Sequence, residues 1–159
     1  MSFVSTPDDA PVSVVTGGAS GIGAATAALL ARRGHQVVTL DRAAVPDATL
    51  AGAVADGRLT HIACDLARED AVCAAFLAIA QRFGRIGGLV NSAGIESRHL
   101  LDDMTVADWD RVLDVNLRGT MLCLREAAPL LRHGGSGVNV ASFAGKRMYY
   151  SGDAAYTAS

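Results

Sequence analysis

Short apolar runs alternate along the chain with longer amphipathic segments. The apolar runs are rich in β-branched residues and predict strands at residues 12–16, 36–41, 58–65, 86–94 and 137–142. The longer segments carry apolar residues at helical spacing and predict helices at residues 21–34, 69–84 and 106–131. Strands that alternate with crossover helices predict an α/β fold built on a doubly wound parallel sheet.

Local signals mark the ends of the predicted helices. Gly34 and Gly84 follow the first two helices as C-terminal caps, and Thr105 with Asp108 forms a capping pattern at the start of the third. The apolar positions at helical spacing are Ile22, Ala25, Leu29 and Leu30 in the first helix, and Trp109, Val112, Leu113, Leu117 and Leu124 in the third. Residues 42–57 predict a loose connection.

Length and charge narrow the function class. The 159 residues fit one domain, without an internal repeat or a linker. A domain of this size buries roughly 70% of the surface that its unfolded chain exposes, so a full core is feasible. The net charge of −2 offers no basic patch for nucleic acid or for an anionic membrane surface. We therefore expect a small-molecule partner, with neither nucleic acid nor membrane involved.

Cysteine and histidine usage indicates neither disulfides nor a metal. Cys64, Cys73 and Cys123 are odd in number and lie in apolar stretches, so we interpret them as reduced core residues. The histidines lack metal-ligand spacing and are expected at the surface or in turns: His35, His61, His99 and His133. Residues 1–11 are polar and predict a flexible segment without a signal peptide, and no apolar run approaches a membrane span, so we predict a cytoplasmic location.

A glycine-rich segment, TGGASGIG at residues 16–23, directly follows the first predicted strand. Gly17 suits a tight turn, Gly21 lets the backbone approach a pyrophosphate, and Gly23 lets the following helix lie close to the sheet. Asp41 ends the second strand eighteen residues after Gly23, where an acidic side chain accepts hydrogen bonds from an adenosine ribose. This combination predicts a dinucleotide site, with residues 12–159 as its domain.

These residues and five further motifs resemble the short-chain dehydrogenase/reductase family over nearly all of the chain from residue 12 onward. The further motifs occur in the family's order: CDL at 64–66, NSAG at 91–94, DVNLRG at 114–119, NVAS at 139–142 and YTAS at 156–159. The resemblance implies a Rossmann-like fold. It assigns cofactor contacts to Gly17, Ser20, Gly21, Ile22, Gly23, Asp41, Asp65, Leu66, Asn91, Ala93 and Gly94.

The resemblance also implies a hydride transfer between NAD(H) and an alcohol or ketone. Tyr156 would move the proton as general acid and base, Ser142 would hold the substrate oxygen, and Asn116 would hold a water that connects the site to solvent. The family's lysine, four residues after the tyrosine, binds the nicotinamide ribose and favours ionisation of the tyrosine. It would follow Ser159, so we expect the chain to stop just before it, to lack C-terminal strands and helices, and to be inactive as it stands.

Several alternatives remain open at this stage. Asp41 and Asp65 are also compatible with ordinary strand-end residues, and Asn91 with a side chain that ties its own turn to the backbone. Asp41 favours NAD over NADP, although Arg42 lies next to it. Tyr149 and Tyr150 are expected on the substrate side. A dinucleotide-binding fragment or pseudoenzyme without turnover is the alternative function, and relatives imply a homodimer or homotetramer for the full-length protein.

Overall fold

A five-stranded sheet forms the centre of the computed structural model, which describes residues 10–43, 48–146 and 153–159. Its strands are β1 (Val12–Thr16), β2 (Gln36–Asp41), β3 (Leu59–Ala63), β4 (Ile86–Asn91) and β5 (Leu131–Asn139). They lie in the order β3-β2-β1-β4-β5, and every neighbouring pair is parallel. The predicted doubly wound parallel sheet is confirmed. Most of the segment predicted to be flexible, residues 1–11, lies outside the described residues.

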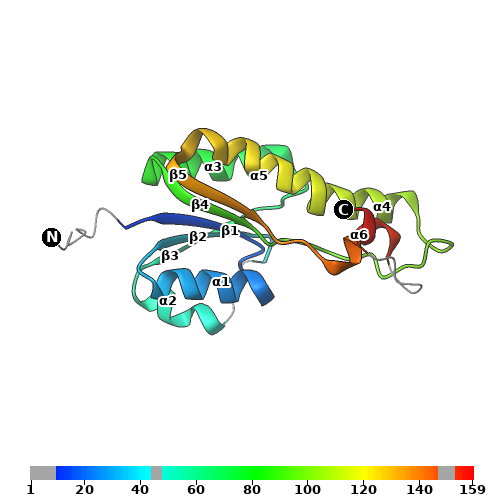
Figure 1. Ribbon diagram of the computed structural model, residues 1–159, viewed down its shortest axis with the longest axis horizontal. Helices are drawn as coiled ribbons and strands as arrows, with labels where there is room; N and C mark the ends of the chain where they lie inside the picture. Colours follow the sequence, from blue (N-terminus) through cyan, green and yellow to red (C-terminus); the bar gives the residue numbers. More distant parts are fainter. Residues whose placement is uncertain (1–9, 44–47, 147–152) are drawn as a thin grey trace.

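Helices cover both faces of the sheet. Figure 1 shows α1 (Gly21–Arg32) and α2 (Ala51–Ala55) on one face, and α3 (Glu69–Phe83) and α5 (Gly119–Ala127) on the other. Two apolar clusters correspond to these layers, and neighbouring β2 residues belong to different ones, Val37 to the first and Val38 to the second. Because the strands are buried on both sides, β1 is buried at all its positions rather than at every second one.

Helix α1 packs through a different face from the one that its large apolar residues predict. Its buried residues are all small, namely Gly23, Ala24, Ala27, Ala28 and Ala31. Ile22 is 64% exposed and Leu29 is 41% exposed. Alanine and glycine allow the helix to lie close against the sheet, which a row of leucines would prevent. The expected end of the helix is confirmed, because Gly34 has a φ of 90° and its N–H donates to the carbonyl of Ala31.

The connection after β2 contains helical structure that the sequence did not predict. A 3-10 turn, η2 (Ala48–Leu50), leads directly into α2. Leu50 is fully buried and belongs to the same apolar cluster as Val37. Its burial gives this segment a reason to fold against α1 instead of remaining a loose connection. Strand β3 is also shorter than predicted.

The predicted long helix is present but interrupted. It consists of α4 (Val106–Leu113), a π-helical turn η3 (Asp114–Arg118), α5 and a 3-10 turn η4 (Ala128–Leu130). Its start is confirmed as a capping box, because the Thr105 side chain accepts from the Asp108 N–H at 3.1 Å. Leu131 begins β5 instead of ending the helix, so this strand starts earlier than predicted and ends at Asn139.

The carboxyl ends of the strands converge where the strand order reverses, between β1 and β4. Ligands of open parallel sheets bind at this kind of switch point. A short 3-10 turn, η5 (Phe143–Gly145), and the last helix, α6 (Ala154–Ala158), follow β5. Figure 1 shows α6 beside α4 at this end of the sheet, and the two helices are in contact. Among the described residues, no helix has both the length and the apolar character needed to span a bilayer.

Candidate active site

Side chains would not fit at Gly17 and Gly23 in the glycine-rich loop after β1. A Cβ on Gly17 would lie 2.7 Å from the Ala93 Cα, and one on Gly23 would lie 2.1 Å from the Gly17 carbonyl oxygen. Gly21 also has a positive φ, of 53°, but it differs from both in that a Cβ there would meet no atom within 4 Å. Gly17 and Gly23 are therefore needed for close packing, while Gly21 leaves open space on the side of the cavity described below.

Within the part of the chain that the structure describes, no side chain caps the backbone N–H groups at the start of α1. Ser20 is the N-cap residue, but its side chain makes no capping hydrogen bond, and the first turn of the helix has no acidic residue. Unpaired N–H groups and the helix dipole favour a phosphate at such a terminus. Together with the open space at Gly21, this terminus fits the pyrophosphate of a dinucleotide.

Asp41 joins the end of β2 to the glycine-rich loop. One carboxylate oxygen accepts from the Ala19 N–H at 3.0 Å, and the other accepts from the Ala43 N–H at 2.9 Å. These two bonds fix the orientation of the carboxylate beside the loop. Asp65 lies after β3, and its carboxylate accepts from the Ala67 N–H at 3.1 Å. Both aspartates organise backbone turns, and both also line the same cavity.

The turn after β4 is held by a residue that sequence reasoning did not single out. The Thr16 hydroxyl oxygen accepts from the N–H groups of Ser92 at 3.1 Å and Ala93 at 3.2 Å. Thr16 is almost fully buried at the end of β1, which pairs with β4. A hydroxyl residue at the end of a buried strand is the only sequence signal for this role. The contact itself joins residues far apart in the chain, so only the pairing of β1 with β4 reveals it.

Asn91 makes a different contact from the expected side-chain tie to its own turn. Its Nδ2 donates to the Oδ1 of Asn139 at 3.0 Å, across the pair formed by β4 and β5. Asn91 is 3% exposed, and within the described residues its Oδ1 has no hydrogen-bond partner. Asn91 therefore lies beneath the site and, unlike the other predicted cofactor residues, does not line either cavity.

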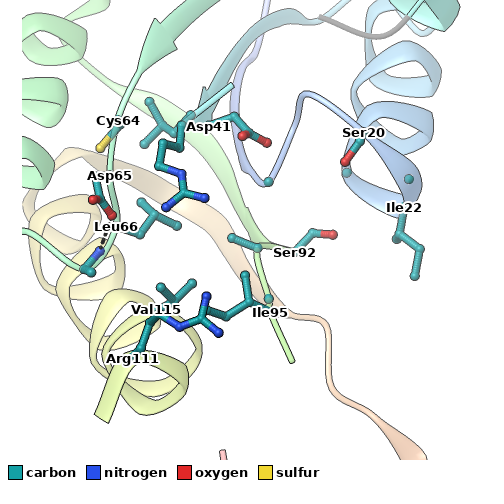
Figure 2. Close-up of a pocket in the computed structure, with 18 residues that line it drawn as sticks. Ser20, Ile22, Asp41, Cys64, Asp65, Leu66, Ser92, Ile95, Arg111 and Val115 are labelled. Carbon is teal, nitrogen blue, oxygen red and sulfur yellow. Dashed lines mark hydrogen bonds between the residues drawn. The ribbon is translucent and has the colours of Figure 1, made fainter. Parts of the chain in front are cut away.

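Residues at or just after the ends of four strands line a cavity of about 610 Å³. It is lined by all the other predicted cofactor residues: Gly17, Ser20, Gly21, Ile22, Gly23, Asp41, Asp65, Leu66, Ala93 and Gly94. Figure 2 shows Asp41 and Asp65 on its walls, with Ser20 and Ile22 at the start of α1 and with Arg111 and Val115 from the long helix. Its size lies within the range of small-molecule sites.

A second cavity, of about 790 Å³, brings together the three predicted catalytic residues, Asn116, Ser142 and Tyr156. The two cavities adjoin, because six residues line both of them: Ile22, Ser92, Ala93, Gly94, Ile95 and Arg111. The predicted cofactor residues and the predicted catalytic residues thus face one continuous space. Tyr149 and Tyr150, which were expected on the substrate side, lie outside the described residues.

Asn116 lies in the π-helical turn η3. Its Oδ1 accepts from the Ile95 N–H at 2.9 Å, and its Nδ2 donates to the Ile95 carbonyl at 3.0 Å and to the Ser159 hydroxyl at 3.0 Å. The Thr120 hydroxyl donates to the Asn116 carbonyl at 2.7 Å. Isolated π-helical turns occur frequently at functional sites. This π-helical turn places the Asn116 amide at the second cavity. Asparagine has poor helix propensity, so its position in the middle of a helix is otherwise unexpected.

Ser142 and Tyr156 lie in two short helical elements, at the start of η5 and within α6. Ser142 is the N-cap residue of η5, and its hydroxyl oxygen accepts from the Ala144 N–H at 3.2 Å. Asp153 caps α6 by accepting from the Tyr156 N–H at 3.1 Å, and its other oxygen accepts from the N–H groups of Ser97 and Arg98. The sequence analysis did not identify Asp153, whose capping position before the tyrosine was the available signal.

The cysteines and histidines were only partly interpreted correctly. All three cysteines are free, but Cys73 is half-buried, whereas Cys64 and Cys123 are buried. Burial raises the pKa of the Cys64 thiol to about 11 and that of Cys123 to about 12, so both stay protonated near neutral pH. His61 lies in the edge strand β3 and is half-buried, so it is neither in a turn nor fully at the surface. In the part of the chain that the structure describes, no group of three His, Cys, Asp or Glu residues is placed to hold a metal.

The comparison with known families decides the assignment. A family described as short chain dehydrogenase matches residues 11–159, which is nearly the whole chain. The chain belongs to the short-chain dehydrogenase family. Membership is consistent with the parallel sheet and with the two adjoining cavities at the carboxyl ends of its strands.

Relatives within this family are dehydrogenases and reductases by name. The chain is 43% identical over 139 residues to the short-chain reductase protein NovJ of Streptomyces niveus, covering 85% of this chain and 53% of that protein. It is 40% identical over 138 residues to the D-threitol dehydrogenase of Mycolicibacterium smegmatis, covering 84% of this chain and 53% of that protein. The chain therefore spans about half the length of these curated relatives.

A solved structure gives the same answer for the fold. The short chain dehydrogenase of Burkholderia cenocepacia in complex with NADP aligns with a TM-score of 0.86 at 38% sequence identity. The match covers 93% of this chain and 62% of that one. The Rossmann-like arrangement predicted from the sequence is therefore shared with a protein that holds a dinucleotide.

Proposed function

We propose that the complete protein is an oxidoreductase that interconverts an alcohol and a ketone with NAD(H), with Tyr156 as general acid and base. One observation carries this proposal. A cavity with a phosphate-compatible helix terminus adjoins a cavity lined by Asn116, Ser142 and Tyr156. A cofactor in the first cavity and a substrate in the second would meet along their shared wall.

The residues of the first cavity would hold the cofactor by complementary chemistry. The free N–H groups at the start of α1 would bind the pyrophosphate, and Gly21 leaves the space for it. Asp41 would accept hydrogen bonds from the adenosine ribose, and Asp65 and Leu66 would face the adenine side of the site. Asn91, Ala93 and Gly94 would support the wall next to the second cavity. When bound, NAD supplies hydride acceptance and donation, which amino-acid side chains do not provide.

The residues of the second cavity would handle the proton and the substrate oxygen. The Tyr156 hydroxyl would donate a proton to the carbonyl oxygen during reduction and remove it from the alcohol during oxidation. The Ser142 hydroxyl would hold the same oxygen in place. Asn116 would hold the Ile95 backbone and a water, so that proton exchange with solvent can follow each turnover.

The preference for NAD over NADP rests on Asp41. Its carboxylate lines the cavity, so it would repel the additional phosphate of NADP. Ser20 carries no charge that would compensate for this repulsion. Arg42 lines the same cavity, and its positive charge would attract the additional phosphate of NADP, which opposes the preference for NAD.

A dinucleotide-binding protein without turnover is the second candidate. Two contacts favour it, because the Asn116 amide is engaged by Ile95 and the Ser142 hydroxyl is engaged by the Ala144 N–H. Both groups have a structural task in the observed arrangement. The two candidates differ in catalysis but not in nucleotide binding, so a turnover measurement separates them.

The remaining proposals concern the molecule in the cell. We propose a cytoplasmic enzyme that assembles as a homodimer or homotetramer through the long helix, where Val106, Leu117 and Met121 are exposed apolar residues. The substrate is a small alcohol or ketone. Sugar, polyol, steroid and short-chain acyl compounds are the classes to be tested.

Turnover by the full-length protein tests the proposed function. NAD reduction would be followed with a panel of sugars, polyols, hydroxysteroids and short-chain hydroxyacyl compounds, and Tyr156→Phe would be the matched variant. We expect the variant to lose activity by roughly 100-fold to 10,000-fold, which is the range for general acid–base catalysis, with NAD affinity unchanged. Full activity of Tyr156→Phe, or NAD binding without turnover of any substrate class, would overturn the proposal.

A further inference from the structure

His61 lies on the edge strand β3 and uses both nitrogens of its imidazole ring. Its Nδ1 lies 3.0 Å from the Thr39 hydroxyl oxygen, and its Nε2 lies 2.9 Å from the Ala43 carbonyl oxygen. Thr39 is fully buried and is the partner of His61 in the pairing of β2 with β3. Neither His61 nor Thr39 lines the two cavities, so this network lies outside both of them.

The chemistry of the two partners determines the tautomer of His61. A carbonyl oxygen only accepts hydrogen bonds, so the ring must carry its proton on Nε2 to bond with Ala43. In a ring that carries one proton, Nδ1 is then the acceptor, and the Thr39 hydroxyl donates to it. The ring therefore links a buried strand residue to the backbone of the turn that follows β2.

The turn that His61 holds is the one that orients Asp41. The Ala43 N–H donates to one carboxylate oxygen of Asp41, and the Ala19 N–H donates to the other. Ala43 thus donates to Asp41 through its N–H and accepts from His61 through its carbonyl. Thr39 supports the same region from below, because a Cβ on Gly18 would lie 2.5 Å from the Thr39 Cγ2. Histidine, turn and glycine-rich loop form one connected unit.

We propose that His61 is a positioning residue for cofactor selectivity, which fixes the turn after β2 and with it the direction of the Asp41 carboxylate. The inference rests on the proposed function, in which Asp41 reads the adenosine ribose of NAD. When the bond to Ala43 is lost, the turn relaxes and the carboxylate loses its fixed orientation. NAD then loses a well-placed acceptor, and NADP meets a weaker repulsion.

Two substitutions separate the two hydrogen bonds of the ring. In His61→Gln, the side-chain amide reaches the position of Nε2 and still donates to the Ala43 carbonyl. In His61→Asn, the shorter amide takes the position of Nδ1, retains an acceptor for Thr39 and loses Ala43. His35→Asn is the matched control, because His35 also bonds a strand hydroxyl through Nδ1, that of Ser13 at 2.8 Å, but does not line either cavity.

The experiment measures the dissociation constants of NAD and NADP by calorimetry on the full-length protein, together with the Tm of each variant. We expect His61→Asn to weaken NAD binding about five-fold, the equivalent of one hydrogen bond, and to narrow the preference over NADP by a similar factor. His61→Gln should restore most of the preference, and His35→Asn should leave it unchanged. If His61→Asn does not fold, Ala43→Gly relaxes the same turn and should narrow the preference in the same way.

Each other outcome has a definite meaning. If both His61 variants retain the wild-type preference, or both lose it equally, the bond to Ala43 does not position Asp41 and the inference is wrong. The preference for NAD over NADP could instead fall in both His61→Asn and His35→Asn, in proportion to the fall in Tm of each variant. That result would indicate a purely structural role for His61 and would also overturn the inference. A wild-type protein that fails to bind NAD contradicts the proposed function itself, and the inference falls with it.

Discussion

The side chain of Asn116 holds the backbone of Ile95 at both of its polar groups, accepting from the N–H at 2.9 Å and donating to the carbonyl at 3.0 Å. The amide therefore pairs with the loop after β4 as a neighbouring strand would. Ile95 lines both cavities, so this pairing sets the wall between the proposed cofactor and substrate positions. The geometry depends on an amide, since it requires an acceptor and a donor on one short side chain.

Replacing Asn116 by aspartate removes the donor and leaves a carboxylate facing the Ile95 carbonyl. We expect the free energy of unfolding to fall by about 1–2 kcal/mol, because the half-buried Ile95 carbonyl loses its donor and faces a charged oxygen, and we expect turnover to fall with it. Denaturant titration and steady-state kinetics on the full-length protein measure both effects. Asp114→Asn in the same π-helical turn is the control, because it removes only the surface ion pair with Arg118, worth about 0.2–1 kcal/mol. Equal effects from the two variants would contradict the structural reading of Asn116.

Gly21 and Gly34 provide a matched pair at the two ends of α1. Both have positive φ, at 53° and 90°, and a Cβ at either would meet no atom within 4 Å. Alanine should therefore cost about 1–2 kcal/mol of stability at each position. Only Gly21 lines the first cavity, so only Gly21→Ala should weaken NAD binding beyond its effect on stability. Isothermal titration beside thermal unfolding checks this, and an equal loss of affinity in Gly34→Ala would rule out a direct role for Gly21.

Asp153 connects the tyrosine helix to the loop after β4. Burial raises the pKa of its carboxyl group, but hydrogen bonds from Ser97, Tyr156 and Arg98 outweigh this and hold the pKa below its ordinary value of 3.8. A depressed carboxyl pKa contributes stability that is present above the ordinary value and is lost as the pH falls through the lower folded value. Asp153→Asn should therefore lower stability at neutral pH and reduce its decline below about pH 4. Unfolding curves from acid to neutral pH measure this, and an unchanged profile would argue against the link.

His35 should contribute to a second pH dependence, closer to neutrality. Burial, followed by the nearby charge of Arg33, lowers the pKa of His35 from its ordinary value of 6.5. Because the folded state favours the neutral ring, its stabilising contribution is complete above pH 6.5 and is lost as the pH falls through the lower folded pKa. His35→Asn should reduce the loss of stability on acidification below this value. Thermal unfolding of the wild-type protein and of His35→Asn from pH 5 to pH 8 gives the comparison. Parallel curves of stability against pH would show that His35 does not contribute to the pH dependence.

The sequence predicted the parts of the fold that depend on local patterns. The runs of β-branched residues mark the five strands, the caps at Gly34 and Thr105 mark two helix ends, and TGGASGIG marks the loop after β1. These signals can be recognised without the tertiary structure, because each depends only on residues that are close in sequence. The prediction of which face of α1 packs on the sheet was wrong. Hydrophobicity alone favours Ile22 and Leu29 over the alanines that approach the sheet.

The sequence by itself determined which residue types follow each strand, and parallel strands bring those positions to one edge of the sheet. Only the tertiary structure decided how they interact. Thr16 reaches Ser92 because β1 pairs with β4, and His61 reaches Ala43 because β3 lies beside β2. Hydrogen bonds need partners within a few tenths of an ångström and in the right direction. No periodicity in a chain encodes such distances between residues that are distant in sequence, so the supports of the site became visible only once the strands were paired.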